Sequence, residues 1–161
     1  MTEEGYKYFA FISYSHKDQQ IARKLKKFLQ SYHLPSELQK NNPELPKRLK
    51  PIFIDESNLI VTGPLAKSLR DHLEVSKFLI VICSPNSAKS EYVNDEVKYF
   101  IENGRADRII PLIVDGVPYS EDLSAECFTP ALRDLPRDLQ PLGIDYKQFK
   151  ERNAFLRVIE A

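Results

Sequence analysis

Small polar side chains gather directly after apolar runs at three places in the sequence. The three clusters are residues 13–18 (SYSHKD), 55–58 (DESN) and 84–87 (SPNS). Because the carboxyl ends of parallel strands meet at one edge of a sheet, and open α/β sheets bind ligands there, the clusters predict a polar site at that edge. Each cluster alone is also explained by the polar residues that turns require. Three clusters at one edge favour a site.

One carboxylate is placed by its spacing near the same edge. Residues 90–103 predict a helix, and its buried stripe is expected to be Val93, Val97, Phe100 and Ile101. Tyr92 and Glu96 are four residues apart and therefore share a helix face just beside that stripe. Glu96 lies about one and a half turns from the helix start, which brings its carboxylate close to the strand ends. The spacing leaves open that Glu96 is a surface residue paired with a lysine.

Other common site chemistries find little support. Neither G-x-G-x-x-G nor G-x-x-x-x-G-K-[ST] occurs, and five glycines in all disfavour a dehydrogenase. A response-regulator receiver could use Asp55 at a strand end, but it needs an acidic pair where residues 13–15 are Ser-Tyr-Ser. His16, His33 and His72 fall in different expected elements, so nothing supports a metal site or a histidine-based triad.

The charge balance argues against nucleic acid as a partner. The 161 residues include 23 Lys plus Arg and 23 Asp plus Glu, so no basic excess is present to neutralise phosphates. The longest apolar run, Phe78–Cys83, has six residues, whereas a membrane span needs roughly 20. Met1–Gly5 is acidic and lacks the apolar core of a signal peptide. Cys83 and Cys127 make no disulfide framework, and free thiols fit a reducing cytosol. We therefore expect a cytoplasmic domain without membrane or nucleic-acid partners.

Strand and helix patterns alternate along the chain. The expected strands are residues 8–13, 52–54, 78–83 and 108–114, with a short edge strand at 142–145. The expected helices are residues 19–32, 66–75, 90–103 and 147–161, and residues 118–140 are expected to be irregular with some helix. This alternation predicts an α/β fold, a flavodoxin-like open sheet of parallel strands with helices on both faces.

Prolines and apolar runs refine this prediction. Residues 33–51 contain four prolines and are expected to form a long surface loop. Phe78–Cys83 is apolar on both faces, which is typical of a central strand. Pro111 lies inside an expected strand and indicates a bulge or an edge position. The final helix ends without Gly or Pro, so we expect residues 1–161 to be a single domain from a longer multidomain protein.

Three motifs together resemble one known family. Residues 9–18 (FAFISYSHKD) resemble the first strand and turn of a TIR (Toll/interleukin-1 receptor) domain of bacterial type. Residues 83–87 (CSPNS), followed by Tyr92 and Glu96, resemble its third strand and the helix that carries an aromatic-x-x-x-Glu motif. Residues 108–116 (RIIPLIVDG) are similar to its fourth strand.

The resemblance, which covers residues 6–161, implies a sheet of about five parallel strands and one of two functions. Many TIR domains cleave NAD+ at the nicotinamide–ribose bond, and some cyclise the ADP-ribose product, whereas others are assembly modules without catalysis. In the enzymes the motif glutamate is catalytic, which assigns Glu96 here. NAD+ is then a substrate, and no cofactor or metal is expected. The substrate-binding residues that the resemblance implies are Tyr14, Ser15, Ser84 and Tyr92.

Two positions depart from the family pattern. Tyr92 stands where the motif aromatic is usually Trp, and Ser15 stands where several NAD+-cleaving members have Arg. The retained Glu96 favours an NAD+ nucleosidase, whereas Ser15 favours the alternative, a non-catalytic scaffold for signalling assembly. The resemblance implies a role in immune or anti-phage signalling.

One carboxylate is sufficient for this cleavage. The nicotinamide is a pyridinium and leaves as a neutral molecule, so it needs no general acid, in contrast to the leaving oxygen of an ordinary glycoside. What remains is an oxocarbenium-like ribose, and Glu96 would stabilise its positive charge and hydrogen-bond its hydroxyls. Tyr14 and Tyr92 would position the ribose or the nicotinamide. Water or the adenine of the substrate then captures the ribose.

The loop after the second strand, residues 56–65, corresponds to the family's BB loop, which docks on a neighbouring TIR domain and helps to complete the site. It holds three consecutive apolar residues and a turn pair, namely Leu59, Ile60, Val61, Gly63 and Pro64. The apolar residues either fold back onto the domain or form an exposed patch. The resemblance implies the second, with self-association of TIR domains into dimers or filaments that activates the enzyme.

Overall fold

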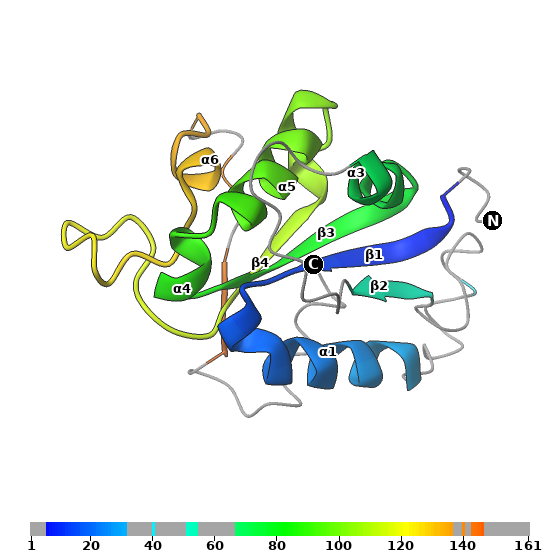
Figure 1. Ribbon diagram of the computed structural model, residues 1–161, viewed down its shortest axis with the longest axis horizontal. Helices are drawn as coiled ribbons and strands as arrows, with labels where there is room; N and C mark the ends of the chain where they lie inside the picture. Colours follow the sequence, from blue (N-terminus) through cyan, green and yellow to red (C-terminus); the bar gives the residue numbers. More distant parts are fainter. Residues whose placement is uncertain are drawn as a thin grey trace.

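Five parallel strands form one sheet in the order β2-β1-β3-β4-β5. The computed structural model describes residues 6–31, 40, 51–54, 67–136, 140 and 143–146. The strands are β1 Tyr8–Ser13, β2 Ile52–Ile54, β3 Ser76–Cys83, β4 Ile109–Ile113 and β5 Ile144–Asp145. The predicted flavodoxin-like α/β sheet is therefore confirmed (Figure 1).

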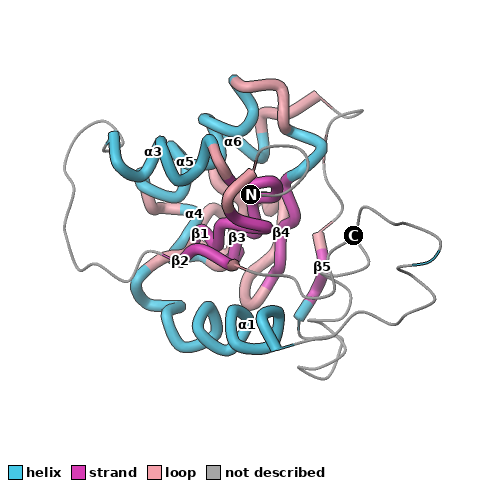
Figure 2. Tube along the Cα trace, turned by 90° about the vertical axis from the view of Figure 1, so that its right-hand side faces the viewer, coloured by secondary structure: helices cyan, strands magenta, loops and turns pink. Residues whose placement is uncertain are grey.

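Helices cover both faces of the sheet. α1 (Gln19–Ser31) packs below the sheet in Figure 1, whereas α3 (Lys67–Glu74) and α5 (Glu91–Glu102) pack above it. The view turned by 90° in Figure 2 shows the same two sides. The short helices are η1 His16–Asp18, α4 Pro85–Ala88, η2 Ala106–Arg108 and α6 Pro130–Arg133.

Each side of the sheet has its own hydrophobic core. Successive residues of β1 point to opposite sides of the sheet. Ile12 therefore belongs to the core between the sheet and α1, and Phe11 belongs to the core between the sheet and α5. β3 contributes to both cores, with Ile80 on the α1 side and Val81 on the α5 side. β3 lies between β1 and β4, which explains why the predicted central strand is apolar on both faces.

Helix α5 begins and ends close to the predicted residues. Ser90 is its N-cap, and the Ser90 hydroxyl accepts a hydrogen bond of 3.2 Å from the backbone N–H of Val93. Asn103 is its C-cap, and the following Gly104 has a φ of 72°, a left-handed conformation that favours glycine. The cap residues therefore fix the length of the helix that carries Glu96.

One detail of the predicted fold is wrong. Pro111 marks neither an edge strand nor a bulge, because β4 lies between β3 and β5 and its register with β3 continues through the proline. β5 pairs only with Leu112 and Ile113, so the ladder on that side begins one residue beyond Pro111. The segment at 84–87 includes part of a helical turn, α4, because the side chains of Ser84 and Ser87 each accept a hydrogen bond from the other residue's backbone N–H.

Most of the expected loop at 33–51 and the whole expected helix at 147–161 lie outside the described residues. Within the part of the chain that the structure describes, no helix has both the length and the apolar character needed to cross a membrane.

Candidate functional site

The Glu96 carboxylate lies buried at the carboxyl edge of the sheet. Glu96 is 1% exposed, and its Oε1 accepts a hydrogen bond of 2.7 Å from the hydroxyl of Ser13, the last residue of β1. Ser13 is also 1% exposed. The two residues are 83 positions apart in the sequence and meet because α5 packs on the side of the sheet to which Ser13 points. The alternative of a surface glutamate is therefore wrong.

Glu96 lies inside the buried stripe of α5 and not beside it. The buried residues of the helix are Val93, Glu96, Val97 and Phe100. Ile101, which was expected in the stripe, is only partly buried. A carboxylate among apolar side chains is costly unless hydrogen bonds are donated to it, as the Ser13 hydroxyl does. Such a placement is typical of a functional carboxylate that stabilises positive charge.

A second hydrogen bond joins the loops that follow β1 and β3. The Ser84 hydroxyl donates to Oδ2 of Asp18 at 2.6 Å and accepts from the backbone N–H of Ser87 at 3.1 Å. Burial raises the pKa of the Asp18 carboxyl above its ordinary 3.8, the bond from Ser84 opposes this rise, and the Asp115 carboxylate adds to it. The polar residues that follow β1, β3 and β4 therefore lie together at one edge, as the strand-end pattern predicts for the first two.

The predicted substrate-binding residues lie on different sides of the sheet. Tyr14 is buried in the core on the α1 side, whereas Tyr92 packs against the core on the α5 side, as Glu96 does. Ser15 is half-buried, and its hydroxyl accepts a hydrogen bond of 3.4 Å from the backbone N–H of Lys17 at the start of η1. Glu96 and Tyr92 thus share one face, and Tyr14 lies across the sheet from both.

The hydroxyl of Ser84, another predicted substrate-binding residue, is engaged within the protein by Asp18 and Ser87, and the residue is buried. The predicted assembly loop, with Leu59, Ile60, Val61 and the Gly63-Pro64 pair, lies outside the described residues. The polar cluster at 55–58 lies outside them as well.

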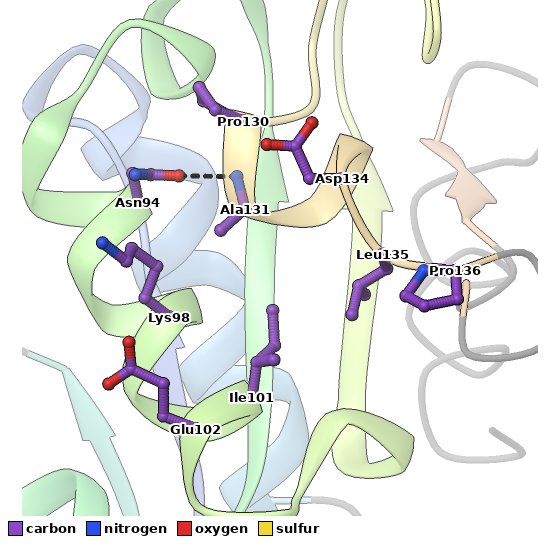
Figure 3. A pocket seen from close by; sticks show the side chains of 9 residues that line it. All are labelled: Asn94, Lys98, Ile101, Glu102, Pro130, Ala131, Asp134, Leu135 and Pro136. Carbon is purple, nitrogen blue, oxygen red and sulfur yellow. Dashed lines mark hydrogen bonds between the residues drawn. The ribbon is translucent and has the colours of Figure 1, made fainter.

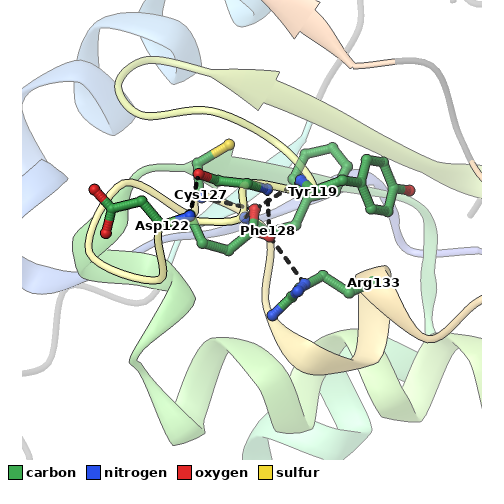
Figure 4. Close-up of polar contacts among 7 residues, drawn as sticks. Tyr119, Asp122, Cys127, Phe128 and Arg133 are labelled. Atoms are coloured by element: carbon green, nitrogen blue, oxygen red, sulfur yellow. Dashed lines mark hydrogen bonds and ion pairs between the residues drawn. The ribbon is translucent and has the colours of Figure 1, made fainter.

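A second buried carboxylate, Glu126, was not identified from the sequence. It is 4% exposed, and its two oxygens accept hydrogen bonds of 3.0–3.2 Å from the backbone N–H groups of Tyr119, Ser120, Cys127 and Phe128. Its Oε1 also lies 2.9 Å from Nε of Arg133 in α6 (Figure 4). Glu126 therefore organises the loop between β4 and α6, residues 114–129, which we call the Glu126 loop. No periodic pattern signals this role, because most of the partners are backbone groups.

The Glu126 loop also requires a glycine. Gly116 has a φ of 81°, and a Cβ at this position would lie 2.5 Å from the carbonyl oxygen of Ala125. The backbone N–H of Val117 donates to the same oxygen at 2.7 Å, which holds the two limbs of the loop together. The loop is thus internally bonded, and it lies directly after the carboxyl end of β4.

Cys83 and Cys127 are free and buried. Burial raises the pKa of the Cys127 thiol to about 12 and that of the Cys83 thiol well above its ordinary value. Both side chains are therefore neutral thiols near pH 7, whereas nucleophilic catalysis by cysteine needs the thiolate.

A groove of about 420 Å³ opens between α5 and α6 (Figure 3). Its lining includes Asn94, Lys98 and Glu102 from α5, and Ala131 and Asp134 beside them. The Asn94 side-chain oxygen accepts a hydrogen bond of 2.8 Å from the backbone N–H of Ala131, which ties the two helices together. Neither Glu96 nor any predicted substrate-binding residue lines this groove, so it is separate from the strand-end site.

An open parallel α/β sheet with a buried carboxylate and polar loops at its carboxyl edge places the chain in the flavodoxin-like class. Comparison with known families then identifies the member of that class. The sequence profile of the TIR domain matches residues 10–156, and the chain belongs to the TIR domain family. The resemblance of the three sequence motifs is thereby confirmed.

The chain is similar in sequence to the NAD(+) hydrolase ApTIR of Actinoplanes sp., with 29% identity over 115 residues. This match covers 68% of the chain but 14% of the length of that protein. In structure it is similar to the TIR domains of the activated Roq1 resistosome, which recognises the pathogen effector XopQ, with a TM-score of 0.59 and 17% identity over 96% of this chain and 98% of that one.

A second solved structure, the TIR domain of the Toll-related receptor TRR-2 from Hydra magnipapillata, matches with a TM-score of 0.51 and 17% identity over 96% of each chain. At this identity, the two structural matches show a common fold.

Proposed function

We propose that the chain is an NAD+ nucleosidase that cleaves the nicotinamide–ribose bond with Glu96 and is activated by self-association. The observation that carries the proposal is the buried Glu96 carboxylate at the carboxyl edge of the sheet. The similarity to a protein named as an NAD(+) hydrolase supports the same substrate and reaction. On the basis of the family resemblance, we propose that the chain acts in a cytoplasmic immune or anti-phage signalling system.

The reaction requires charge stabilisation and not proton transfer to the leaving group. The C1′–N bond breaks with its electron pair going to nicotinamide, which leaves neutral, and the positive charge remains on the ribose. Glu96, in surroundings largely free of water, stabilises that charge more strongly than it would in bulk solvent. Water then forms the new C1′–O bond and releases a proton to solvent, or the adenine of the substrate forms a C1′–N bond and yields a cyclic product.

The other predicted residues surround this step. In our proposal, Tyr92 positions the substrate on the α5 side, and Ser15 and Tyr14 form the part of the pocket that follows β1. Ser84 acts through its bond to Asp18, which keeps the loops after β1 and β3 together. We expect Leu59, Ile60 and Val61 to contact a neighbouring copy of the chain.

The decisive experiment measures nicotinamide release from NAD+ by chromatography, with purified chain at high concentration. Glu96→Gln removes the charge but keeps an oxygen that can accept the Ser13 hydrogen bond, so we expect turnover to fall by about 100-fold or more while the fold persists. Glu91→Gln is the matched control, because Glu91 is an exposed residue in the first turn of the same helix. We expect Glu91→Gln to keep the activity of the parent.

A non-catalytic scaffold is the second candidate function. It is favoured by Ser15, which stands where several NAD+-cleaving relatives have Arg, and by the 1% exposure of Glu96. Intact NAD+ after long incubation of the assembled chain would establish this alternative and reject the nucleosidase.

A further inference from the structure

Ser13 and Glu96 are polar residues at positions that face the apolar core. Ser13 follows Phe11 on the side of β1 that faces α5, and its strand partner is Val81 of β3. Glu96 stands between Val93 and Val97 in the buried stripe of α5. An apolar side chain at either position would pack without any desolvation cost, so the polar groups call for an explanation other than packing.

One short hydrogen bond joins the two residues. The Oγ to Oε1 distance of 2.7 Å is that of a well-formed hydroxyl hydrogen bond. Ser13 belongs to a strand that is paired on both sides, with β2 and β3. The sheet therefore holds the backbone of Ser13 in place. A hydrogen bond from its hydroxyl restrains the Glu96 side chain, which otherwise has several rotatable bonds.

We propose that Ser13 is a positioning residue for Glu96: its hydroxyl holds the carboxylate in one orientation at the end of β1, facing the strand-end site. This inference rests on the proposed function and adds a residue to it. Ser13 does not contact the substrate in this proposal. It acts on the rate of the chemical step through the place of the carboxylate, and a misplacement of about 1 Å can cost 100-fold in rate.

Steady-state kinetics of Ser13→Ala test the proposal. We expect kcat to fall by about 10- to 100-fold, with KM nearly unchanged, because substrate binding does not depend on the Ser13 hydroxyl. Ser13→Thr keeps a hydroxyl at the same place and should recover most of the lost kcat. A loss of kcat caused only by partial unfolding would also leave KM unchanged. The rates are therefore expressed per folded molecule, with the folded fraction of each variant measured by circular dichroism at the assay temperature.

Ser76→Ala is the matched control. Ser76 is a 0% exposed serine in the same sheet, and its hydroxyl donates a hydrogen bond of 2.7 Å to the backbone carbonyl of His72. It lies at the first residue of β3, at the opposite edge of the sheet from Glu96. The same substitution at this buried serine therefore removes an equally short bond away from the site, and we expect kcat and KM to stay at the parent values.

A double-mutant cycle tests the bond by a measurement that does not depend on NAD+. Ser13→Ala should lower the urea midpoint of unfolding in the parent background and have a smaller effect in the Glu96→Leu background, because the bond is already absent there. Equal effects in both backgrounds would overturn the proposal, since the two side chains would then be energetically independent.

The kinetic outcomes separate this inference from the function on which it rests. If the parent chain cleaves NAD+ and Ser13→Ala matches Ser76→Ala, the positioning role is wrong while the nucleosidase stands. If Ser13→Ala is faster than the parent, the bond restrains Glu96 instead of placing it, and the proposal is again overturned. If neither the parent nor any variant cleaves NAD+, the nucleosidase and the positioning role fail together.

Discussion

Glu96 occupies a buried helix position at which an apolar residue such as leucine is usual. A carboxyl group at such a position suggests a functional role. The spacing of the sequence puts this residue on the correct helix and near the correct edge of the sheet. The spacing does not distinguish a position beside the apolar stripe from one inside it. The two differ by a rotation of α5 about its own axis that is smaller than the angle of about 100° between successive residues. That rotation depends on how α5 packs against β3, α3 and α6, which is a property of the tertiary structure.

The Asp18 carboxyl makes stability depend on pH with an unusual sign. Its pKa is raised by burial in the folded chain, so the folded state holds this proton more readily than the unfolded state does. As the pH rises from 3.8 through the raised value, the parent therefore loses stability at this position. Asp18→Asn keeps an acceptor for Ser84 without the titration. We expect its unfolding free energy, relative to the parent, to increase across this pH window in urea unfolding experiments.

Asp122 provides the opposite case in the same protein. Hydrogen bonds from Ser124 hold the pKa of the Asp122 carboxyl below its ordinary 3.8, and the side chain is exposed. The parent then gains stability as the pH rises toward 3.8. The unfolding free energy of Asp122→Asn, relative to the parent, should therefore decrease over this pH range. If the two variants changed with pH in the same direction, the assignment of these shifts to burial and to hydrogen bonding would be wrong.

Ser13 and Asp18 show why parts of a site escape sequence analysis. Both lie in the motif at residues 9–18, but nothing in that motif says which hydroxyl faces which carboxylate. Ser13 meets Glu96 from 83 positions away, and Asp18 meets Ser84 from 66 positions away. The strand periodicity shows that Ser13 shares a side with Phe11. That this side faces the helix carrying Glu96 is known only from the structure.

At the scale of the elements, the Glu126 loop is organised by a single side chain. Glu126→Ala removes the acceptor of four backbone N–H groups and the partner of Arg133. The N–H of Cys127 keeps a second acceptor, the Val117 carbonyl at 3.2 Å, whereas the buried N–H of Phe128 loses its acceptor. We expect this change to lower the free energy of unfolding by about 3 kcal/mol. Urea unfolding measures the loss, and amide hydrogen exchange should show faster exchange at Tyr119, Ser120 and Phe128.

Glu121→Ala is the control for this loop, because Glu121 is an exposed carboxylate a few residues away. Its effect on the unfolding free energy should stay within about 0.5 kcal/mol. Slow exchange at the amides of Tyr119, Ser120 and Phe128 in Glu126→Ala would mean that other contacts hold the loop and that the carboxylate is dispensable.

Regular elements were predicted well because they carry periodic signals. β1, β3 and α5 each show the spacing of their own secondary structure, and Ser90 and Gly104 mark the ends of α5 in the sequence. The register of β4 through Pro111 was predicted wrongly, because the cost of a missing N–H depends on where the neighbouring strand begins. The Glu126 loop has no period at all, and its order comes from one carboxylate that binds backbone groups.

At the scale of the whole molecule, the proposed function makes activity depend on concentration. Residues 56–65 hold Ile60 between two further apolar residues, and in our proposal this segment contacts a neighbouring copy. Activity per molecule should then rise with protein concentration in the parent. Ile60→Asp should lower both this activity and self-association, measured by analytical ultracentrifugation, while the monomer stays folded.

Leu123→Asp is the control for the negative charge that Ile60→Asp adds. Leu123 is 68% exposed in the Glu126 loop, so an aspartate there costs no packing. We expect this variant to associate and react as the parent does. Constant activity per molecule over a wide dilution series, in the parent as in Ile60→Asp, would show that the monomer is complete and that the segment at 56–65 is not an assembly element.

The strand order also sets when the site can form during synthesis of the chain. β1 emerges from the ribosome first, but one of its two neighbours is β3, and the carboxylate that meets its last residue comes 83 residues later. At translation rates of about 5–20 residues per second, β1 waits several seconds for this partner. A nascent chain that ends before α5 has no Glu96 and cannot assemble the strand-end site. Synthesis of the chain beyond α5 therefore comes before the assembly of this edge of the sheet.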